Sequence, residues 1–336
     1  MSTEPALEVR NLTVDYPGRG GRPFRAVDAL SLSLRAGDTL ALVGESGSGK
    51  STVVRALSRL VRHTAGSVRL EGEKVSGEEY RRAVQMVFQD PFASLNPAHT
   101  VDHHLRRPLL ATHRARRGGE ADAAVAQLLE SVNLVPAGDV ARKRPHELSG
   151  GQRQRVAIAR ALATEPRVLL ADEPVSMLDV SIRLEILNLL DRARRQRQLA
   201  LLYVTHDLAT ARHFSDEVMV MYRGRVVEHG PSDDVILTPR HPYTQLLAAA
   251  ARGRSGGAVA PSTARGRSRP GMRAAPSVGA VPWQRPRAPG PFGCSRSARD
   301  TRCAAFRWRT PDRRALRGGR CPQREERTTR GGSSRR

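Results

Sequence analysis

The sequence predicts an α/β fold in which helices cover a parallel sheet. Two stretches indicate it: short apolar runs alternate with helical stripes over 167–250, and one more such pair occupies 40–61. Strand–helix alternation favours parallel strands, because each helix carries the chain back across the sheet. Residues 7–87 begin with a β-rich part, and 90–165 has a mainly helical pattern.

Each predicted element follows from the spacing of its apolar residues. Leu40–Val43 is a short apolar run between glycines, as in a buried strand, and Lys50–Val61 carries its apolar residues on one helical face. Helices are also expected over Asp122–Val132, which has an apolar stripe, and over the Ala-rich run Val156–Ala163. Further along the chain we expect the strands Val168–Ala171, Leu199–Val204 and Glu217–Met221 and the helices Val180–Arg194 and Asp207–Phe214.

The positive charge of the chain is concentrated at its C-terminal end. Residues 252–336 hold 22 arginines, no lysine and 4 acidic residues, so they carry +18 of the net +23 and leave +5 for the other 251 residues. The folded part is therefore not expected to present the basic surface of a nucleic-acid-binding protein. The stretch 252–336 is also rich in Gly, Pro and Ser and lacks hydrophobic periodicity, which predicts a disordered tail after a domain spanning 7–250.

The sequence offers no candidate for a membrane span or a secretory signal. Its longest apolar run is about six residues, Leu199–Val204, against the roughly 18 that a span requires. Met1–Leu7 has neither a basic start nor an apolar stretch. The three cysteines all lie in the tail, so disulfides are not expected to hold the domain. We therefore expect a cytosolic protein.

Residues 44–51 fit the pattern G-x-x-x-x-G-K-S between a predicted strand and a predicted helix. Glycines let backbone N–H groups turn toward phosphate oxygens, and the N-terminus of the following helix carries a partial positive charge. The pattern predicts a nucleoside triphosphate site in which Lys50, one of only three lysines, reaches the β- and γ-phosphates and Ser51 ligates Mg²⁺. The residues predicted to contact the nucleotide here are Gly44, Glu45, Ser46, Gly47, Ser48, Gly49, Lys50, Ser51 and Thr52.

Two carboxylates follow the predicted strand Val168–Ala171. Asp172 stands where a phosphate-loop enzyme holds Mg²⁺, and Glu173 is then placed to polarise the attacking water. Both acids would alternatively only cap the segment that begins at Pro174. The glycine-rich loop about 120 residues earlier favours the catalytic interpretation.

A third motif, at 148–152, specifies a family. Its residues are Leu148, Ser149, Gly150, Gly151 and Gln152. A serine and two glycines that open a helix make a second anion-binding N-terminus, with an ordinary N-cap as the alternative. With this motif the sequence resembles the ATP-binding cassette (ABC) superfamily over about 7–250. The resemblance implies a P-loop NTPase (RecA-like) core with a β-rich N-terminal part and an inserted α-helical subdomain at about 90–165. It also implies that each signature closes on ATP held by a second cassette.

Other positions match this family one by one. Tyr16 stands where an aromatic ring stacks on adenine, although a core aromatic of a strand is the alternative. Gln89 resembles the loop glutamine that contacts Mg²⁺ and water, and His206 resembles the switch histidine that senses the γ-phosphate. Ser176 and Asp179 lie in a segment similar to the loop that crosses the dimer interface. The resemblance thus implies catalytic roles for Glu173, His206, Gln89 and Lys50, and Mg²⁺ ligation by Ser51, Gln89 and Asp172.

Longer phrases resemble the oligopeptide/dipeptide/nickel importers, and most closely their second ATPase. They lie at 88–97, 145–155, 178–182 and 241–244. The resemblance implies an ATPase motor that works with a second ATPase subunit, two transmembrane permeases and an extracytoplasmic binding protein, at the cytoplasmic face of the membrane. Peptides, short oligosaccharides and nickel stay open as cargo, and so does a homo- or heterodimer. The alternative class, a non-transport ABC ATPase acting on nucleic acid or ribosomes, normally has two cassettes or a long insertion. Only 97 residues separate Lys50 from Leu148.

The tail departs from this family. Relatives often carry four closely spaced cysteines that hold an iron–sulfur cluster, whereas this chain has three widely spaced ones, Cys294, Cys303 and Cys321. No iron–sulfur cluster is therefore expected. The Arg-rich, Lys-free composition is also what a shifted reading frame in GC-rich DNA would yield, and translation of the other two frames tests that idea.

Overall fold

The computed structural model describes residues 4–18 and 22–255. These belong to the first of two compact units, Met1–Ala264, and the second unit, Arg265–Arg336, lies outside the described residues. Helix α11 (Pro242–Ser255) includes the first residues of the stretch predicted as a tail. The other predictions for that stretch, namely its disorder and the state of its cysteines, fall outside the described residues.

Within the described residues, the main sheet has six strands in the order β5-β6-β7-β3-β8-β9. Its first five strands are mutually parallel, and β9 pairs antiparallel to β8. The central strands β3, β6 and β7 are buried over their whole length because both faces of the sheet are covered. This sheet confirms the predicted parallel α/β core. Its strands are β3 (Thr39–Val43), β5 (Val84–Val87), β6 (Val168–Asp172), β7 (Ala200–Thr205), β8 (Glu217–Tyr222) and β9 (Arg225–Pro231).

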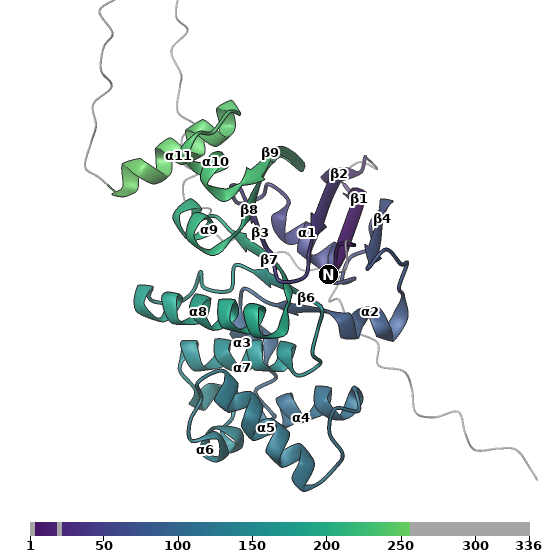
Figure 1. Cartoon of the computed structure of the whole chain (residues 1–336), viewed down its shortest axis with the longest axis vertical. Coiled ribbons are helices and arrows are strands. Elements are labelled where there is room, and N and C mark those ends of the chain that lie inside the picture. The colour runs from purple at the N-terminus through teal and green to yellow at the C-terminus, as the bar shows by residue number, and fades with distance from the viewer. Residues whose placement is uncertain (1–3, 19–21, 256–336) are drawn as a thin grey trace, which may run out of the picture. The chain divides into compact units, whose positions relative to one another are not determined.

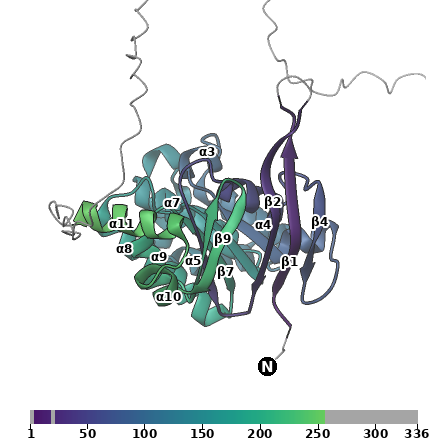
Figure 2. The same ribbon diagram turned by 90° about the horizontal axis from the view of Figure 1, so that it is seen from above.

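A smaller antiparallel sheet forms the β-rich N-terminal part that the sequence predicts. It consists of β1 (Leu7–Tyr16), β2 (Phe24–Leu34) and β4 (Ala65–Leu70), in the order β2-β1-β4. In Figure 2 these strands stand together along one side of the molecule. Their inward side chains share one hydrophobic core with helix α1 (Lys50–Leu57) and one face of the main sheet. This packing holds α1, the helix that begins at Lys50, against the sheet.

The opposite face of the main sheet packs on a second, larger core built mostly from helices. Figure 1 shows α3–α7 gathered below α8 and β6. The helices of this group are α3 (Pro91–Ser94), α4 (Val101–Ala111), α5 (Gly119–Ser131), α6 (Ala137–Arg142) and α7 (Gly150–Leu162). Besides α1 and α11, the structure also describes the α-helices α2 (Gly77–Ala83), α8 (Val180–Arg197), α9 (Leu208–Phe214) and α10 (Ser232–Leu237). None of the described helices is long and apolar enough to cross a membrane.

Helix α1 is shorter than predicted. The sequence pattern continues to Val61, but the helix ends at Leu57. The N–H groups of Leu60 and Val61 both turn back to the carbonyl of Arg55, at 2.9 and 3.1 Å, and Arg59 adopts a left-handed φ of 59°. Both bonds satisfy the carbonyl of Arg55 in the last turn, and the chain leaves the helix there. Leu60 is consequently 59% exposed although its spacing fits the apolar stripe.

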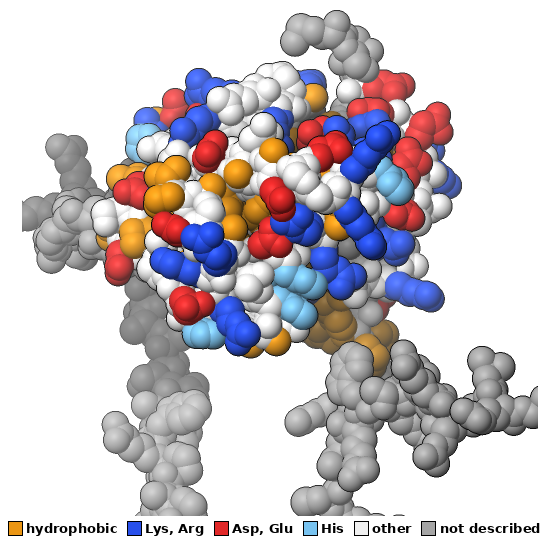
Figure 3. Space-filling view, turned by 90° about the horizontal axis from the view of Figure 1, so that it is seen from below, with side chains coloured by type: hydrophobic (Ala, Val, Ile, Leu, Met, Phe, Trp, Pro, Cys, Tyr) orange, Lys and Arg blue, Asp and Glu red, His pale blue; other side chains and the backbone are white. Residues whose placement is uncertain are grey.

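The face of the helical group seen in Figure 3 carries basic and acidic side chains intermixed, with apolar patches between them. Within the helical group, Arg106 of α4 binds both Asp102 and Asp122, at 2.5 and 2.6 Å. On this face the described part of the chain therefore presents no continuous basic surface, consistent with the small net charge of residues 1–251.

The contact between α7 and α8 leads to a stability prediction. A Cβ added at Gly151 would lie 2.8 Å from Cγ2 of Ile182, whereas one at Gly150 would meet Leu178 at an ordinary 3.6 Å. Ile182 is β-branched and cannot easily yield. We expect Gly151→Ala to lower the free energy of unfolding by roughly 1–3 kcal/mol. The control Gly150→Ala should stay within about 0.5 kcal/mol of wild type in the same urea titration. Equal effects of the two substitutions would contradict this packing.

Candidate functional site

The carboxyl ends of three adjacent parallel strands form one edge of the main sheet. Val43 at the end of β3 pairs with Thr205 of β7, and Asp172 at the end of β6 pairs with Val204 of β7. This register places the glycine-rich loop, the two carboxylates and His206 at the same edge. In open α/β sheets, ligands bind beyond the carboxyl ends of the strands. The edge is therefore the candidate functional site.

The loop between β3 and α1 requires its glycines. Gly44 and Gly49 have φ values of 153° and 109°, which L side chains rarely adopt. A Cβ at Gly44 would lie 2.3 Å from the carbonyl oxygen of Met221, and one at Gly49 would lie 2.5 Å from that of Ala26. The loop is thus wedged between β8 and β2 by backbone contacts. A glycine-rich loop of this kind can surround an anion with backbone N–H groups.

Lys50 is buried, and its ammonium group is satisfied by its own loop. Nζ donates to the carbonyls of Gly44 and Glu45, at 2.7 and 2.9 Å. Burial lowers the pKa of Lys50, and the nearby carboxylates of Glu173 and Asp172 oppose this effect. Burial keeps water away from the ammonium group of Lys50. An anion bound at the loop would take the place of that water and would favour the charged form of Lys50.

Ser51 and Asp172 contact each other directly below the loop. The Ser51 hydroxyl donates to Oδ1 of Asp172 at 3.1 Å. Asp172 is buried, and this burial raises the pKa of its carboxyl group in spite of the Ser51 hydrogen bond. A hydroxyl and a carboxylate are the hard oxygen ligands that suit Mg²⁺, which binds one or two carboxylates and keeps phosphate or water oxygens. Among the described residues, no group of three or more His, Cys, Asp or Glu side chains could hold a metal by itself. The pair therefore fits Mg²⁺ shared with a phosphate.

The Glu173 carboxylate connects two predicted site residues. Its Oε2 accepts a hydrogen bond from Nε2 of Gln89 at 3.3 Å and lies 3.3 Å from Nδ1 of His206. Glu173 has a left-handed φ of 44°, and its N–H donates to the carbonyl of Val204 at 3.0 Å. This backbone turn directs the side chain toward the edge, since a non-glycine residue keeps such a conformation only when its surroundings fix it.

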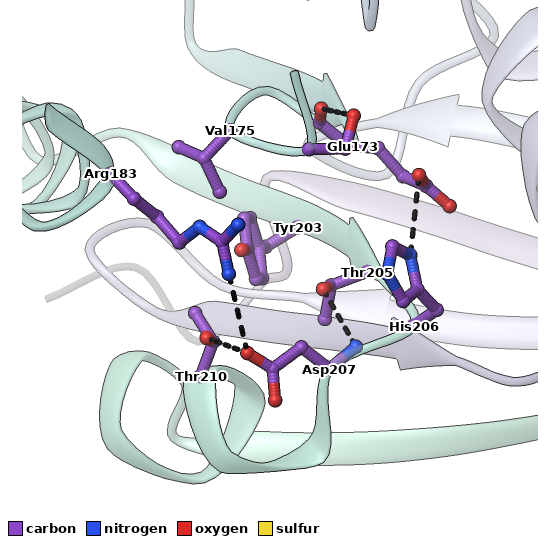
Figure 4. A pocket seen from close by; sticks show the side chains of 9 residues that line it. Glu173, Val175, Arg183, Tyr203, Thr205, His206, Asp207 and Thr210 are labelled. Atoms are coloured by element: carbon purple, nitrogen blue, oxygen red, sulfur yellow. Dashed lines mark hydrogen bonds and ion pairs between the residues drawn. The ribbon is translucent and has the colours of Figure 1, made fainter. Parts of the chain in front are cut away.

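Behind Glu173 lies a small cavity, most of whose lining residues have polar or charged side chains (Figure 4). Its volume is about 30 Å³, far below the 300 Å³ or more of a ligand pocket, so it cannot hold a nucleotide. Arg183 reaches Asp207 across it at 4.0 Å, and Asp207 also caps α9 by accepting from the N–H of Ala209 at 3.0 Å. These contacts support the segment that carries His206. The sequence pattern indicates no functional role for Arg183 or Asp207, and Asp207 enters it only as the start of the predicted helix Asp207–Phe214.

The signature residues form the start of α7. Ser149 caps the helix by accepting from the N–H of Gln152 at 3.2 Å, and the Gln152 side chain accepts from the N–H of Ser149 at 3.0 Å. Leu148 is buried and Ser149 is exposed. Within the described residues, no hydrogen bond joins 148–152 to the loop 44–51.

Four other predicted residues are Ser176, Asp179, Thr52 and Tyr16. The Ser176 hydroxyl donates to the carbonyl of Glu173 at 3.0 Å, while Asp179 is exposed at the N-terminus of α8. Thr52 follows Ser51 in the first turn of α1. Tyr16 is half-buried at the end of β1, opposite Phe24 of β2, and the described residues show no ring contact or hydrogen bond between Tyr16 and the loop. Its adenine-stacking role thus stays a prediction.

This chain is similar in sequence to known proteins. The family model described as ABC transporter matches residues 27–176. The glutathione import ATP-binding proteins GsiA of Pectobacterium atrosepticum and Escherichia coli (strain K12) are 46% and 47% identical in alignments of 259 positions that cover 74% of this chain. The chain covers only 41% of the length of these curated relatives.

Solved structures are also similar to this chain. The ATP-binding cassette MJ0796, in a dimeric post-hydrolysis state bound to ADP and Pi, is 31% identical with a TM-score of 0.61, covering 67% of this chain and 98% of that one. CbiO1 of Clostridium perfringens, part of the ABC transporter complex cbiONQ, is 27% identical with a TM-score of 0.61, covering 70% of this chain and 92% of that one. The chain therefore belongs to the ABC transporter family, as an ATP-binding cassette.

Proposed function

We propose that this chain is the ATP-hydrolysing motor subunit of an ABC importer. The observation that carries the proposal is the meeting of Lys50, Ser51, Asp172, Glu173 and His206 at one edge of the sheet. A cation for phosphate, oxygen ligands for Mg²⁺ and a carboxylate bonded to a histidine are the parts that phosphoryl transfer to water requires.

Each of these residues has a distinct task in the proposed reaction. The loop amides and the Lys50 ammonium bind the β- and γ-phosphates and stabilise the charge that grows on them. Mg²⁺, held by Ser51 and Asp172 and approached by Gln89, would supply further neutralisation of the phosphate oxygens. Glu173 orients a water molecule and accepts its proton as the oxygen attacks the γ-phosphorus and the bond to the β-phosphate oxygen breaks. His206 holds Glu173 and contacts the γ-phosphate.

The working form in this proposal is a pair of cassettes. The signature of one chain, Leu148–Gln152, presents an exposed capped helix start that closes on the ATP of the other chain. The segment from Ser176 to Asp179 crosses between them, and Met177, 58% exposed, packs at that interface. The solved cassette MJ0796 is itself described as dimeric. Homo- and heterodimers both satisfy this geometry.

The proposed cargo is a short peptide. The curated relatives are named for glutathione import, and glutathione is a small peptide. Short oligosaccharides or nickel are the other cargoes to test.

We place the chain at the cytoplasmic face of the membrane with two permeases and an extracytoplasmic binding protein. A groove of about 540 Å³, lined by Gln89, Arg160 and Asp172 among others, adjoins the site and suits a permease contact that senses ATP hydrolysis.

One prediction of this mechanism concerns the attacking water. Glu173→Gln keeps the size of the side chain but removes the proton acceptor, so we expect kcat for ATP to fall by at least about a hundredfold while ATP binding is retained. Phosphate release and fluorescent-nucleotide binding measure the two properties. The matched control is Glu217→Gln, because Glu217 also pairs with a histidine, His229, at 2.9 Å, but on β8 and β9. Turnover at the wild-type rate in Glu173→Gln would refute the role of Glu173.

Another prediction of this mechanism concerns Mg²⁺. Ser51→Ala removes one proposed ligand, so the Mg²⁺ concentration for half-maximal ATPase activity should rise at least about tenfold. Ser58→Ala is the control, because Ser58 ends the same helix with its hydroxyl donating to the carbonyl of Arg55 at 3.2 Å. An unchanged Mg²⁺ dependence in Ser51→Ala would remove Ser51 from the proposed site.

A further inference from the structure

Helix α11 reaches the phosphate loop through one side chain. The hydroxyl of Tyr243, in the first turn of α11, accepts a hydrogen bond from the backbone N–H of Glu45 at 3.1 Å. The two residues are 198 positions apart in the sequence. Figure 1 shows α11 beside α10, at the end of the molecule opposite the helical group α3–α7. The contact therefore connects the C-terminal end of the described chain to the nucleotide site.

Tyr243 is held in place by contacts of its own. Its ring packs on the ring of Tyr222, with the centroids 4.4 Å apart. The Glu228 carboxylate of β9 accepts hydrogen bonds from the N–H groups of Arg240 and His241, at 2.8 and 3.1 Å. The N–H of Tyr243 in turn donates to Nδ1 of His241 at 3.2 Å. The start of α11 is thus fastened to β9, and its tyrosine is directed at the loop.

The peptide group that joins Gly44 to Glu45 is bound on both sides. Its carbonyl, which belongs to Gly44, accepts from the Lys50 ammonium at 2.7 Å, while its N–H, which belongs to Glu45, donates to the Tyr243 hydroxyl at 3.1 Å. The side chain of Glu45 is exposed, so only the backbone is fixed. A peptide group held at one end alone would rotate, and its carbonyl would no longer set the position of Lys50.

We propose that Tyr243 is a positioning residue for ATP binding, because its hydroxyl fixes the peptide group between Gly44 and Glu45 and thereby the loop that receives the phosphates. The inference rests on the proposed use of this loop for ATP. It makes the affinity for nucleotide depend on how α11 is docked, so that the C-terminal segment modulates the site without contacting ATP.

The test is Tyr243→Phe in the full chain, which keeps the ring and removes only the hydroxyl. Loss of one hydrogen bond that positions the loop should raise the Kd and KM for Mg–ATP about three- to tenfold. We expect kcat to stay within about twofold, because the residues around Glu173 are untouched. The Kd is measured by displacement of trinitrophenyl-ATP, and KM and kcat by phosphate release.

The matched control is Tyr222→Phe. It makes the same change on the ring that contacts Tyr243, and within the described residues the Tyr222 hydroxyl makes no hydrogen bond, so its KM should equal that of wild type. Glu228→Ala removes the anchor of α11 and should raise KM in the same direction. Adding Tyr243→Phe to Glu228→Ala should then cause little further rise, since both act through one contact.

The outcomes separate the two proposals. A Kd and KM of wild-type value in Tyr243→Phe overturns the positioning role, and so does an equal rise in Tyr222→Phe, which would assign the effect to ring packing. A fall in kcat without a change in KM also overturns it. A wild-type chain that binds no trinitrophenyl-ATP would instead refute the proposed ATP site itself.

Discussion

The parallel pairing of β3, β6 and β7 is the constraint on which the site depends. Because these strands run in the same direction with a fixed register, the residues that follow Val43, Asp172 and Thr205 emerge at one edge. A one-residue slip of β6 would turn Asp172 to the other face of the sheet and separate it from Ser51. The two hydrophobic cores, one on each face, oppose such a slip, so the chemistry of the site is secured by apolar packing away from it.

The electrostatics of the edge favour binding of an anion together with a cation. Burial lowers the pKa of Lys50 and raises that of Asp172, so each charged form is disfavoured by its environment. The charge of Lys50 is offset by Glu173, Asp172 and Glu45. The charge of Asp172 is offset by the Ser51 hydrogen bond, Arg55 and Lys50, whereas Glu173 opposes it. A phosphate group beside Lys50 and a divalent cation beside Asp172 would favour both charged forms, which couples nucleotide binding to the stability of this region.

Local patterns predicted much of this molecule and missed its long-range contacts. The α/β core, the phosphate loop and the order of Asp172 and His206 after their strands follow from short apolar runs and glycine spacing. The end of α1 at Leu57 could not be predicted from apolar spacing, because Leu60 keeps that spacing while its N–H turns back to the carbonyl of Arg55. Tyr243 lies in the phrase 241–244 that resembles the importer family, but nothing in the sequence indicated its contact with the loop. The contact of Arg183 with Asp207 likewise had no local signal, since such partners meet only when distant elements pack.

Hydrogen–deuterium exchange of the full chain with and without Mg–ATP tests the central claim most directly, namely that the edge formed by β3, β6 and β7 is the nucleotide site. Bound phosphate would occupy loop amides and fix the segments beside them. Slower exchange in the peptides that contain residues 44–52, 172–176 and 205–207 is the result predicted. Unchanged exchange in these peptides at saturating Mg–ATP, with protection appearing only elsewhere, would contradict the account.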